Sequence, residues 1–416
     1  MGIQKVMVEY KNKFLMLWRF TFIKIAILIQ IGYLIVSTFL FFTVFSSEND
    51  FILFYNAGYR IINDINNLYL KESIDFFFRY FPFSAFFYTP FSLWDFTFGY
   101  FSFMMFNLLL NIGICILIYK IIKITTSKRI DKERLSRFLA LFLGAAPQVN
   151  NYILGQNNLL VIFVLLASLY IFIKYNSLKY EFLASLLIGI SINIKPITIL
   201  IIPFLLVFLY HSKKDKIIIF IKRTISSLIG VSLILLPNIF LFFYFPKLWE
   251  GFINNNFGGV NIVSINHSFS ISKLILNLFV FFNLPYNQFI ILLISLLLFG
   301  GFSLYLFGKC FSNENSLIFG FAYGILIMLL AYFDSWNHHL LVLIPLLIII
   351  LFNIPENGKI STFYFKPSLL YYVFLDLLFM GIWFSLRQWF PFNFVSTVFL
   401  ILNFYGISKY LNRSKR

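Results

Sequence analysis

The chain has 416 residues, of which 60% are hydrophobic and 12% are charged, and its net charge is +17. Soluble domains are about 45–50% apolar and about 25% charged, so this composition excludes an ordinary soluble protein and is typical of a membrane protein with many spans. The positive charge does not indicate nucleic-acid binding, because the basic residues form short clusters between apolar segments, as cytoplasmic loops do. Two cysteines, Cys115 and Cys310, lie in unrelated segments and predict no disulfide framework.

Apolar segments that could cross a bilayer, which needs about 17–25 residues, follow one another along most of the chain. We predict about twelve crossings, at residues 20–45, 97–122, 135–149, 157–174, 182–194, 196–210, 217–245, 287–307, 316–332, 340–352, 369–386 and 392–408. The three short segments among them are included because the basic clusters around them should all be cytoplasmic. Lys195 and Pro196 then form the outer tip of a short hairpin, since proline ends the preceding helix.

Both termini are expected to be cytoplasmic, and the chain is expected to form a single all-α integral membrane domain. Its parts are the first span (20–45), the first outer loop (46–96), the central spans (97–353) and the last spans with a basic cytoplasmic tail (354–416). Two apolar segments too short to cross, residues 81–94 and 268–282, are expected to lie on the outer face as interfacial helices.

The unusual polar motifs all fall on the outer side of this topology. They are Asp50, the Arg79-Tyr80 pair, the sequence GQNN at 155–158, Lys195, the sequence NHS at 266–268 and the sequence DSWNHH at 334–339. Unrelated polar turns would be scattered over both faces. Their gathering on one side indicates a single extracytoplasmic cavity.

Each of these residues also has a purely structural interpretation. Asn49 or Asp50 would cap the helix that begins there, by accepting hydrogen bonds from its first amides. The others would serve as interfacial anchors, caps or snorkelling side chains: Arg79, Lys195, Gln156, Asn157, His338 and His339. Adjacent histidines are a poor metal pair, and no zinc, phosphate-loop or dinucleotide motif occurs. We therefore predict no cofactor and assign no metal ligand, and leave a divalent metal open.

The order and spacing of the outer motifs resemble glycosyltransferase family 87. The resemblance is carried by NDFILFYNAGYRI, YLKESIDFFFRYFPFSAFFYTPFSLW, ILGQNNLLVIFVLLASL, GISINIKPITILIIPFLLV, INHSFS and DSWNHHLLVLIPLL, within residues 20–352. It implies a GT-C membrane fold and transfer of mannose, or another hexose or pentose, from a polyprenyl-phosphate donor. It also implies an acidic base on the outer face, at the position of Asp50. The family's Asn-Gln-Ser motif here reads Asn266-His267-Ser268, a departure that concerns the sugar or acceptor more than the fold.

Such a donor requires one carboxylate, because a phosphate with a second pKa near 6 can leave without being protonated. The carboxylate removes the acceptor's proton as its oxygen attacks the anomeric carbon, which inverts that centre. Glycosidases, which expel a poor leaving group, typically use two carboxylates. We expect Asp50 to be the base, with Glu48 as its rival. The donor phosphate and sugar are expected to bind Arg79, Tyr80, Gln156, Asn157, Lys195, Asn266, Ser268, His338 and His339.

The predicted partners are the polyprenyl-phosphate sugar, a lipid- or polysaccharide-linked acceptor and the bilayer, with no nucleic acid and no protein partner. The predicted location is a bacterial plasma membrane, with the site on its extracytoplasmic face. Two alternatives remain open. A lipid-linked saccharide transporter or flippase would need polar residues along a transmembrane path, where Asp376 is the main one. A surface-polysaccharide polymerase or ligase would usually carry one large outer loop.

Overall fold

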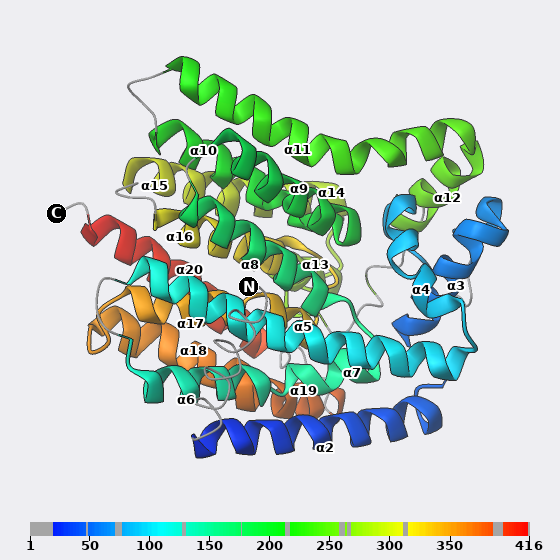
Figure 1. The fold of residues 1–416 in the computed structure, drawn as a ribbon, viewed down its shortest axis with the longest axis horizontal. Coiled ribbons are helices and arrows are strands. Elements are labelled where there is room, and N and C mark those ends of the chain that lie inside the picture. The colour runs from blue at the N-terminus through cyan, green and yellow to red at the C-terminus, as the bar shows by residue number, and fades with distance from the viewer. Residues whose placement is uncertain are drawn as a thin grey trace, which may run out of the picture.

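The computed structural model describes residues 20–46, 49–70, 77–126, 130–175, 177–212, 217–257, 263, 268–310, 315–385 and 394–414. Within these ranges every regular element is helical, as the composition and the resemblance predict. The helices lie side by side in a broad bundle, with α2 (Thr21–Thr43) along one edge and α11 (Ile217–Tyr244) along the opposite edge (Figure 1).

Four helices are long and apolar enough to cross a membrane. They are α2, α5 (Phe96–Thr125), α11 and the continuous helix Gln288–Cys310, which comprises α14 (Gln288–Ser295), a π-helical turn (Leu296–Gly301) and α15 (Phe302–Cys310). In the most apolar 18-residue stretch of each of these helices, only 22–39% is buried inside the protein. Most of this apolar surface therefore faces outward. Such a surface is stable when lipid covers it, and the chain is a membrane protein.

The other predicted crossings correspond to shorter helices, so the total of about twelve crossings stays a prediction. These helices are α6 (Lys132–Leu143), α7 (Pro147–Ile153), α8 (Asn158–Lys174), α9 (Leu178–Ile194), α10 (Ile202–Ser212), α16 (Ser316–Ala331), α17 (Ile344–Asn353), α18 (Lys366–Leu370), α19 (Asp376–Ser385) and α20 (Val395–Ser414). The segment expected to cross at 135–149 is divided between α6 and α7, because Pro147 begins a new helix.

Two apolar helices, α16 and α17, lie inside the bundle. Every residue of α16 is buried, and so is almost all of α17. A helix that is apolar all round is stable where other helices surround it. These two helices therefore form an inner layer, and the connection between them carries the DSWNHH motif.

The helical breaks on the predicted outer side agree with the sequence. α9 ends at Ile194, Lys195 caps it, and a 3₁₀ helix (Pro196–Ile201) begins the return to α10. The two segments expected to be interfacial are helical as well: a 3₁₀ helix (Pro82–Phe87) with α4 (Thr89–Ser92), and α13 (Ile271–Phe281). Their position on the membrane surface stays a prediction. α3 (Asp50–Asn63), α4 and α12 (Pro246–Phe257) gather at one end of the bundle (Figure 1).

Candidate active site

The structure resolves which residue caps α3. Asn49 is the N-cap, and its Oδ1 accepts a hydrogen bond from the Ile52 amide at 3.0 Å. Asp50 is consequently the first residue of the helix, and its carboxylate is not needed for capping. Its Oδ2 instead accepts a hydrogen bond from Gln156 Nε2. Asp50 and the GQNN turn, 106 residues apart in the chain, thus meet as the sequence predicts.

Backbone hydrogen bonds fasten this turn to the start of α3. The Leu154 carbonyl accepts from the amides of both Asp50 and Phe51, at 3.0 and 3.1 Å. Gly155 follows with φ of +62°, in the left-handed region, and a Cβ there would lie only 2.4 Å from the Phe51 Cβ. Glycine is therefore required at the position that brings Gln156 to Asp50.

We expect Gly155→Ala to destabilise the protein and to lower its activity. The left-handed conformation costs an L-residue about 1–2 kcal/mol, and the close approach to Phe51 adds to this cost. The measurement is thermal unfolding in detergent. Gly32→Ala is the matched control, since a Cβ at Gly32 in α2 meets nothing within 4 Å and alanine favours a helix. Equal unfolding temperatures for the two variants would contradict the assigned role of Gly155.

Arg79 belongs to the same site and pairs with a carboxylate that the sequence did not single out. Its Nη1 lies 3.4 Å from Asp334 Oδ2, and its guanidinium lies over the Phe77 ring at 4.4 Å. Asn256 Nδ2 from α12 donates to the Arg79 carbonyl at 3.1 Å. Asp334 is the first residue of the DSWNHH motif, and its place on the predicted outer side was the signal available in the sequence.

Lys195 reaches the same region through a series of amide side chains. Its Nζ donates to Asn158 Oδ1 at 2.6 Å, and Asn158 Nδ2 donates to Asn151 Oδ1 at 3.2 Å. Asn151 Nδ2 then donates to the carbonyl oxygen of Gln156 at 3.3 Å. Because these side chains are buried, the lysine is held in a fixed place relative to Asp50.

The charges of these residues act on one another's pKa values. Burial, followed by the charge of Asp334, raises the pKa of Asp50 to about 6, although Arg79, the Gln156 hydrogen bond and Lys195 oppose the shift. Burial lowers the pKa of Lys195 to about 7, against the opposing effect of Asp334 and Asp50. A carboxylate and an amine that titrate near neutrality are suited to proton transfer and charge stabilisation.

Aromatic side chains form a wall beside the carboxylate. The Phe54 ring, one helical turn after Asp50, stacks on Tyr88 at a centroid distance of 4.4 Å and lies 5.5 Å from Tyr80. Tyr88 Oη accepts a hydrogen bond from Asn157 Nδ2 at 2.7 Å. The predicted residues Tyr80 and Asn157 therefore lie at the site, together with Tyr88, which no motif in the sequence singled out.

The two histidines belong to the connection that carries Asp334, and Ser268 contacts this connection from a separate segment before α13. The Ser335 amide donates to Ser268 Oγ at 3.2 Å, and the Trp336 amide donates to His339 Nδ1 at 3.2 Å. His338 packs edge-on against His339 at 4.3 Å, and both are buried. These contacts hold the connection in shape. Two further candidates, Glu48 and Asn266, lie outside the described residues.

The model of glycosyltransferase family 87 matches residues 77–333, which is more than half of the chain. The chain belongs to glycosyltransferase family 87. The match includes Arg79, the GQNN turn and Lys195, whereas Asp50 precedes it and Asp334 follows its last residue. No curated protein matches the chain.

Family 87 membership makes this chain a membrane glycosyltransferase, and it places the convergence of charges in the context of sugar transfer. Within the described residues, no cluster of three His, Cys, Asp or Glu side chains suits a metal ion. The residues described above offer two carboxylates, two cations and several amides for that chemistry.

Proposed function

We propose that this family 87 enzyme transfers a hexose or pentose from a polyprenyl-phosphate donor to a lipid- or glycan-linked acceptor, with inversion. The reaction would take place on the extracytoplasmic face of a bacterial plasma membrane, because the site residues belong to the outer side of the topology predicted from the sequence. The observation that carries the proposal is the environment of Asp50. Asn49 caps the helix, so the Asp50 carboxylate is not used for capping and instead accepts a hydrogen bond from Gln156. The charges of Arg79, Lys195 and Asp334 act on it as well.

Asp50 has the properties of a general base for this reaction. A base works best when its pKa is near the working pH, and burial raises that of Asp50 to about 6. The carboxylate accepts the proton of the acceptor hydroxyl while that oxygen forms its bond to the anomeric carbon. The bond from the anomeric carbon to the phosphate oxygen breaks on the opposite face, and the electron pair leaves with the phosphate. One carboxylate and no protein nucleophile are needed.

Lys195 is the better candidate for contact with the departing phosphate. Its hydrogen-bond partner, Asn158, is neutral, whereas the guanidinium of Arg79 already pairs with Asp334. Charge that grows on a leaving group is stabilised by a fixed cation in an enclosed site. Arg79 then serves mainly to position Asp334 and to moderate the charge of Asp50.

Two buried acceptors support sugar binding. Among the described residues, Gln156 Oε1 and Asn157 Oδ1 are enclosed and have no hydrogen-bond partner in the protein. A buried acceptor without a donor costs free energy, which a bound ligand with hydroxyl groups would recover. Both atoms are next to the Asp50 contact, and the Tyr88 and Tyr80 rings offer a surface for the sugar's apolar face.

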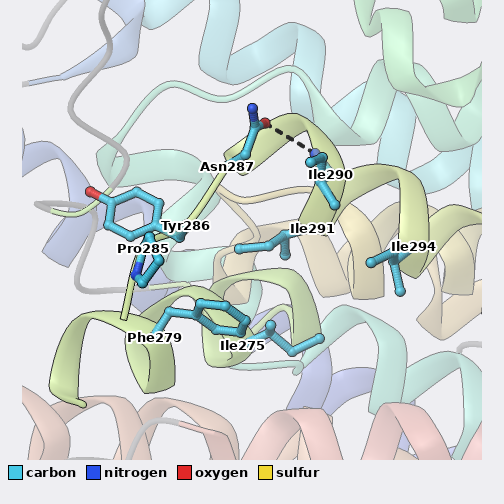
Figure 2. Close-up of a pocket in the computed structure, with 8 residues that line it drawn as sticks. All are labelled: Ile275, Phe279, Pro285, Tyr286, Asn287, Ile290, Ile291 and Ile294. Atoms are coloured by element: carbon cyan, nitrogen blue, oxygen red, sulfur yellow. Dashed lines mark hydrogen bonds between the residues drawn. The ribbon is translucent and has the colours of Figure 1, made fainter. Parts of the chain in front are cut away.

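An apolar groove next to the site suits the isoprenoid tail. The groove lies between α13 and α14 and has a volume of about 500 Å³. Figure 2 shows five of the residues that line it: Ile275, Phe279, Ile290, Ile291 and Ile294. Ile275 and Ile291 also pack with Phe333, the residue before Asp334. A tail in this groove would lie against the segment that leads to Asp334, and each buried CH₂ contributes about 0.8 kcal/mol.

The test is a transfer assay with purified enzyme and polyprenyl-phosphate sugars of decreasing chain length. We expect transfer with inverted configuration, determined by NMR of the product, and a KM that rises as the tail is shortened. Ile290→Asn in the groove should raise the KM for the long donor but not for the short one. Ile239→Asn, on the exposed side of α11, is the control that places the same change outside the groove. Efficient use of nucleotide sugars without a lipid would contradict the proposal.

A further inference from the structure

The connection that carries Asp334 is held by a neighbouring segment of three residues, Ser268, Phe269 and Ser270. The Phe269 amide donates to the Ser335 carbonyl at 3.0 Å, and the Ser335 amide donates to Ser268 Oγ at 3.2 Å. Both polar groups of the Ser335 backbone are thus bound to this segment. Since Ser335 directly follows Asp334, the segment determines where the carboxylate that pairs with Arg79 lies.

The opposite edge of the same segment is held by α20. Thr397 Oγ1, in the first turn of that helix, donates to the Phe269 carbonyl. Phe269 is fully buried and Thr397 is 2% exposed. Phe269 therefore connects two elements through its backbone alone, with its amide toward Ser335 and its carbonyl toward Thr397.

The start of α20 is in turn fixed by a buried acid. Ser396 Oγ donates to Asp376 Oδ1 of α19, and Tyr371 Oη lies 2.9 Å from the same Ser396 oxygen. All three side chains are buried. An ionisable residue among apolar helices is costly to place and commonly has a function. Here its hydrogen bond sets the position of the residue next to Thr397.

We propose that α20 is a positioning element of the active site, although it lies outside the segment that matches family 87. Asp376, Ser396, Thr397 and Phe269, which we call the C-terminal brace, hold Ser335 and thereby Asp334. Thr397 is a positioning residue, and it touches no reacting atom. The kinetic consequences of the brace rest on the proposed function, whereas its mechanical role does not.

A change in the brace should alter two properties of the site together. Asp334 pairs with Arg79, and its charge contributes to the raised pKa of Asp50. Movement of the connection would misalign the guanidinium and bring the pKa of Asp50 down toward its ordinary value. The groups that act on the pKa of Asp50 through their charge or a hydrogen bond are Asp334, Arg79, Gln156 and Lys195. Three tyrosines also face it and respond to its charge: Tyr80, Tyr88 and Tyr332.

The kinetic test compares Thr397→Val with Thr397→Ser. Valine keeps the shape and removes the hydroxyl, whereas serine keeps the hydroxyl. We expect Thr397→Val to lower kcat/KM about tenfold, within the 10²-fold that a misplacement of about 1 Å can cost. The acid limb of its pH profile should move to lower pH. Thr397→Ser should restore both. A loss of activity without movement of the acid limb would overturn the brace, because a merely weakened fold has that effect.

A second readout does not depend on the reaction. The probe is a Ser335→Cys thiol in a variant that lacks Cys115 and Cys310. Position 335 is fully buried, and the brace contacts only the backbone of Ser335, so the side chain can be changed. We expect slow labelling by a soluble thiol reagent, faster labelling when Thr397→Val is added, and slow labelling with Thr397→Ser. Equal rates in all three backgrounds would overturn the brace. The labelling result and the activity of Asp50→Asn are independent of each other. If Thr397→Val speeds labelling and Asp50→Asn nevertheless keeps full activity, the brace is supported and the proposed base is refuted.

Discussion

An Asp50→Asn variant is expected to fold and bind its donor, and to lose about 10²–10⁴-fold in kcat, the usual effect of removing a general base. Asparagine can still accept the Gln156 hydrogen bond through its Oδ1, but it cannot take a proton. Stability should change little, because Asn49 caps α3. The measurements are single-turnover transfer, donor binding and thermal unfolding of the purified variant.

Asp95→Asn is the matched control. Asp95 is exposed, and it caps α5 by accepting hydrogen bonds from the Thr97 and Phe98 amides. Asparagine caps a helix about as well as aspartate. If Asp95→Asn is fully active and Asp50→Asn is inactive, the loss of activity is due to the Asp50 carboxylate and not to the removal of a negative charge in general. If Asp50→Asn keeps full activity, Asp50 is not the base, and Glu48→Gln becomes the decisive variant.

Replacement of Lys195 by glutamine should reduce kcat/KM by about 10²–10³-fold, equivalent to the roughly 2.7–4 kcal/mol lost when a donor to developing negative charge is removed. Glutamine can keep a hydrogen bond to Asn158 while the charge disappears. Lys247→Gln, at an exposed lysine of α12, is the matched control. The loss for Arg79→Gln should be smaller in the chemical step, because Arg79 already pairs with Asp334. Equal kinetics for Lys195→Gln and Lys247→Gln would make Lys195 a structural residue.

The pH dependence of transfer is expected to have two limbs of definite sign. Asp50 must be ionised and Lys195 protonated, so activity should fall as pH drops below about 6 and also as pH rises above about 7. Because the two groups interact, the limbs report the pair and not either residue alone. The Lys195→Gln variant should lose the alkaline limb and retain an acid limb.

The sequence predicted those features that depend on local pattern. The helical class follows from composition, the break at Lys195 follows from Pro196, and the gathering of polar motifs follows from the placement of basic clusters. The number of crossings stays a prediction. α16 and α17 are short and buried on every side, and a uniformly apolar segment has no periodicity that distinguishes contact with lipid from contact with protein.

Contacts between distant segments could not be predicted from the sequence. Arg79 and Asp334 are 255 residues apart, and nothing in either motif names the other as its partner. The choice of Asn49 over Asp50 as the cap depends on a turn more than 100 residues away, which holds the Asp50 backbone and its carboxylate. Asn151 and Asn158 look like ordinary polar residues at helix ends until Lys195 is seen to bind there.

The separation of Arg79 from Asp334 also has a consequence for biosynthesis. The ribosome delivers Asp50 and Arg79 early, when the first spans enter the membrane, and Asp334 only after most of the chain has been made. Until then Asp50 lacks a neighbour that raises its pKa, and Arg79 lacks its partner. A nascent or prematurely terminated chain would therefore sit in the membrane without the Arg79–Asp334 pair of the proposed site.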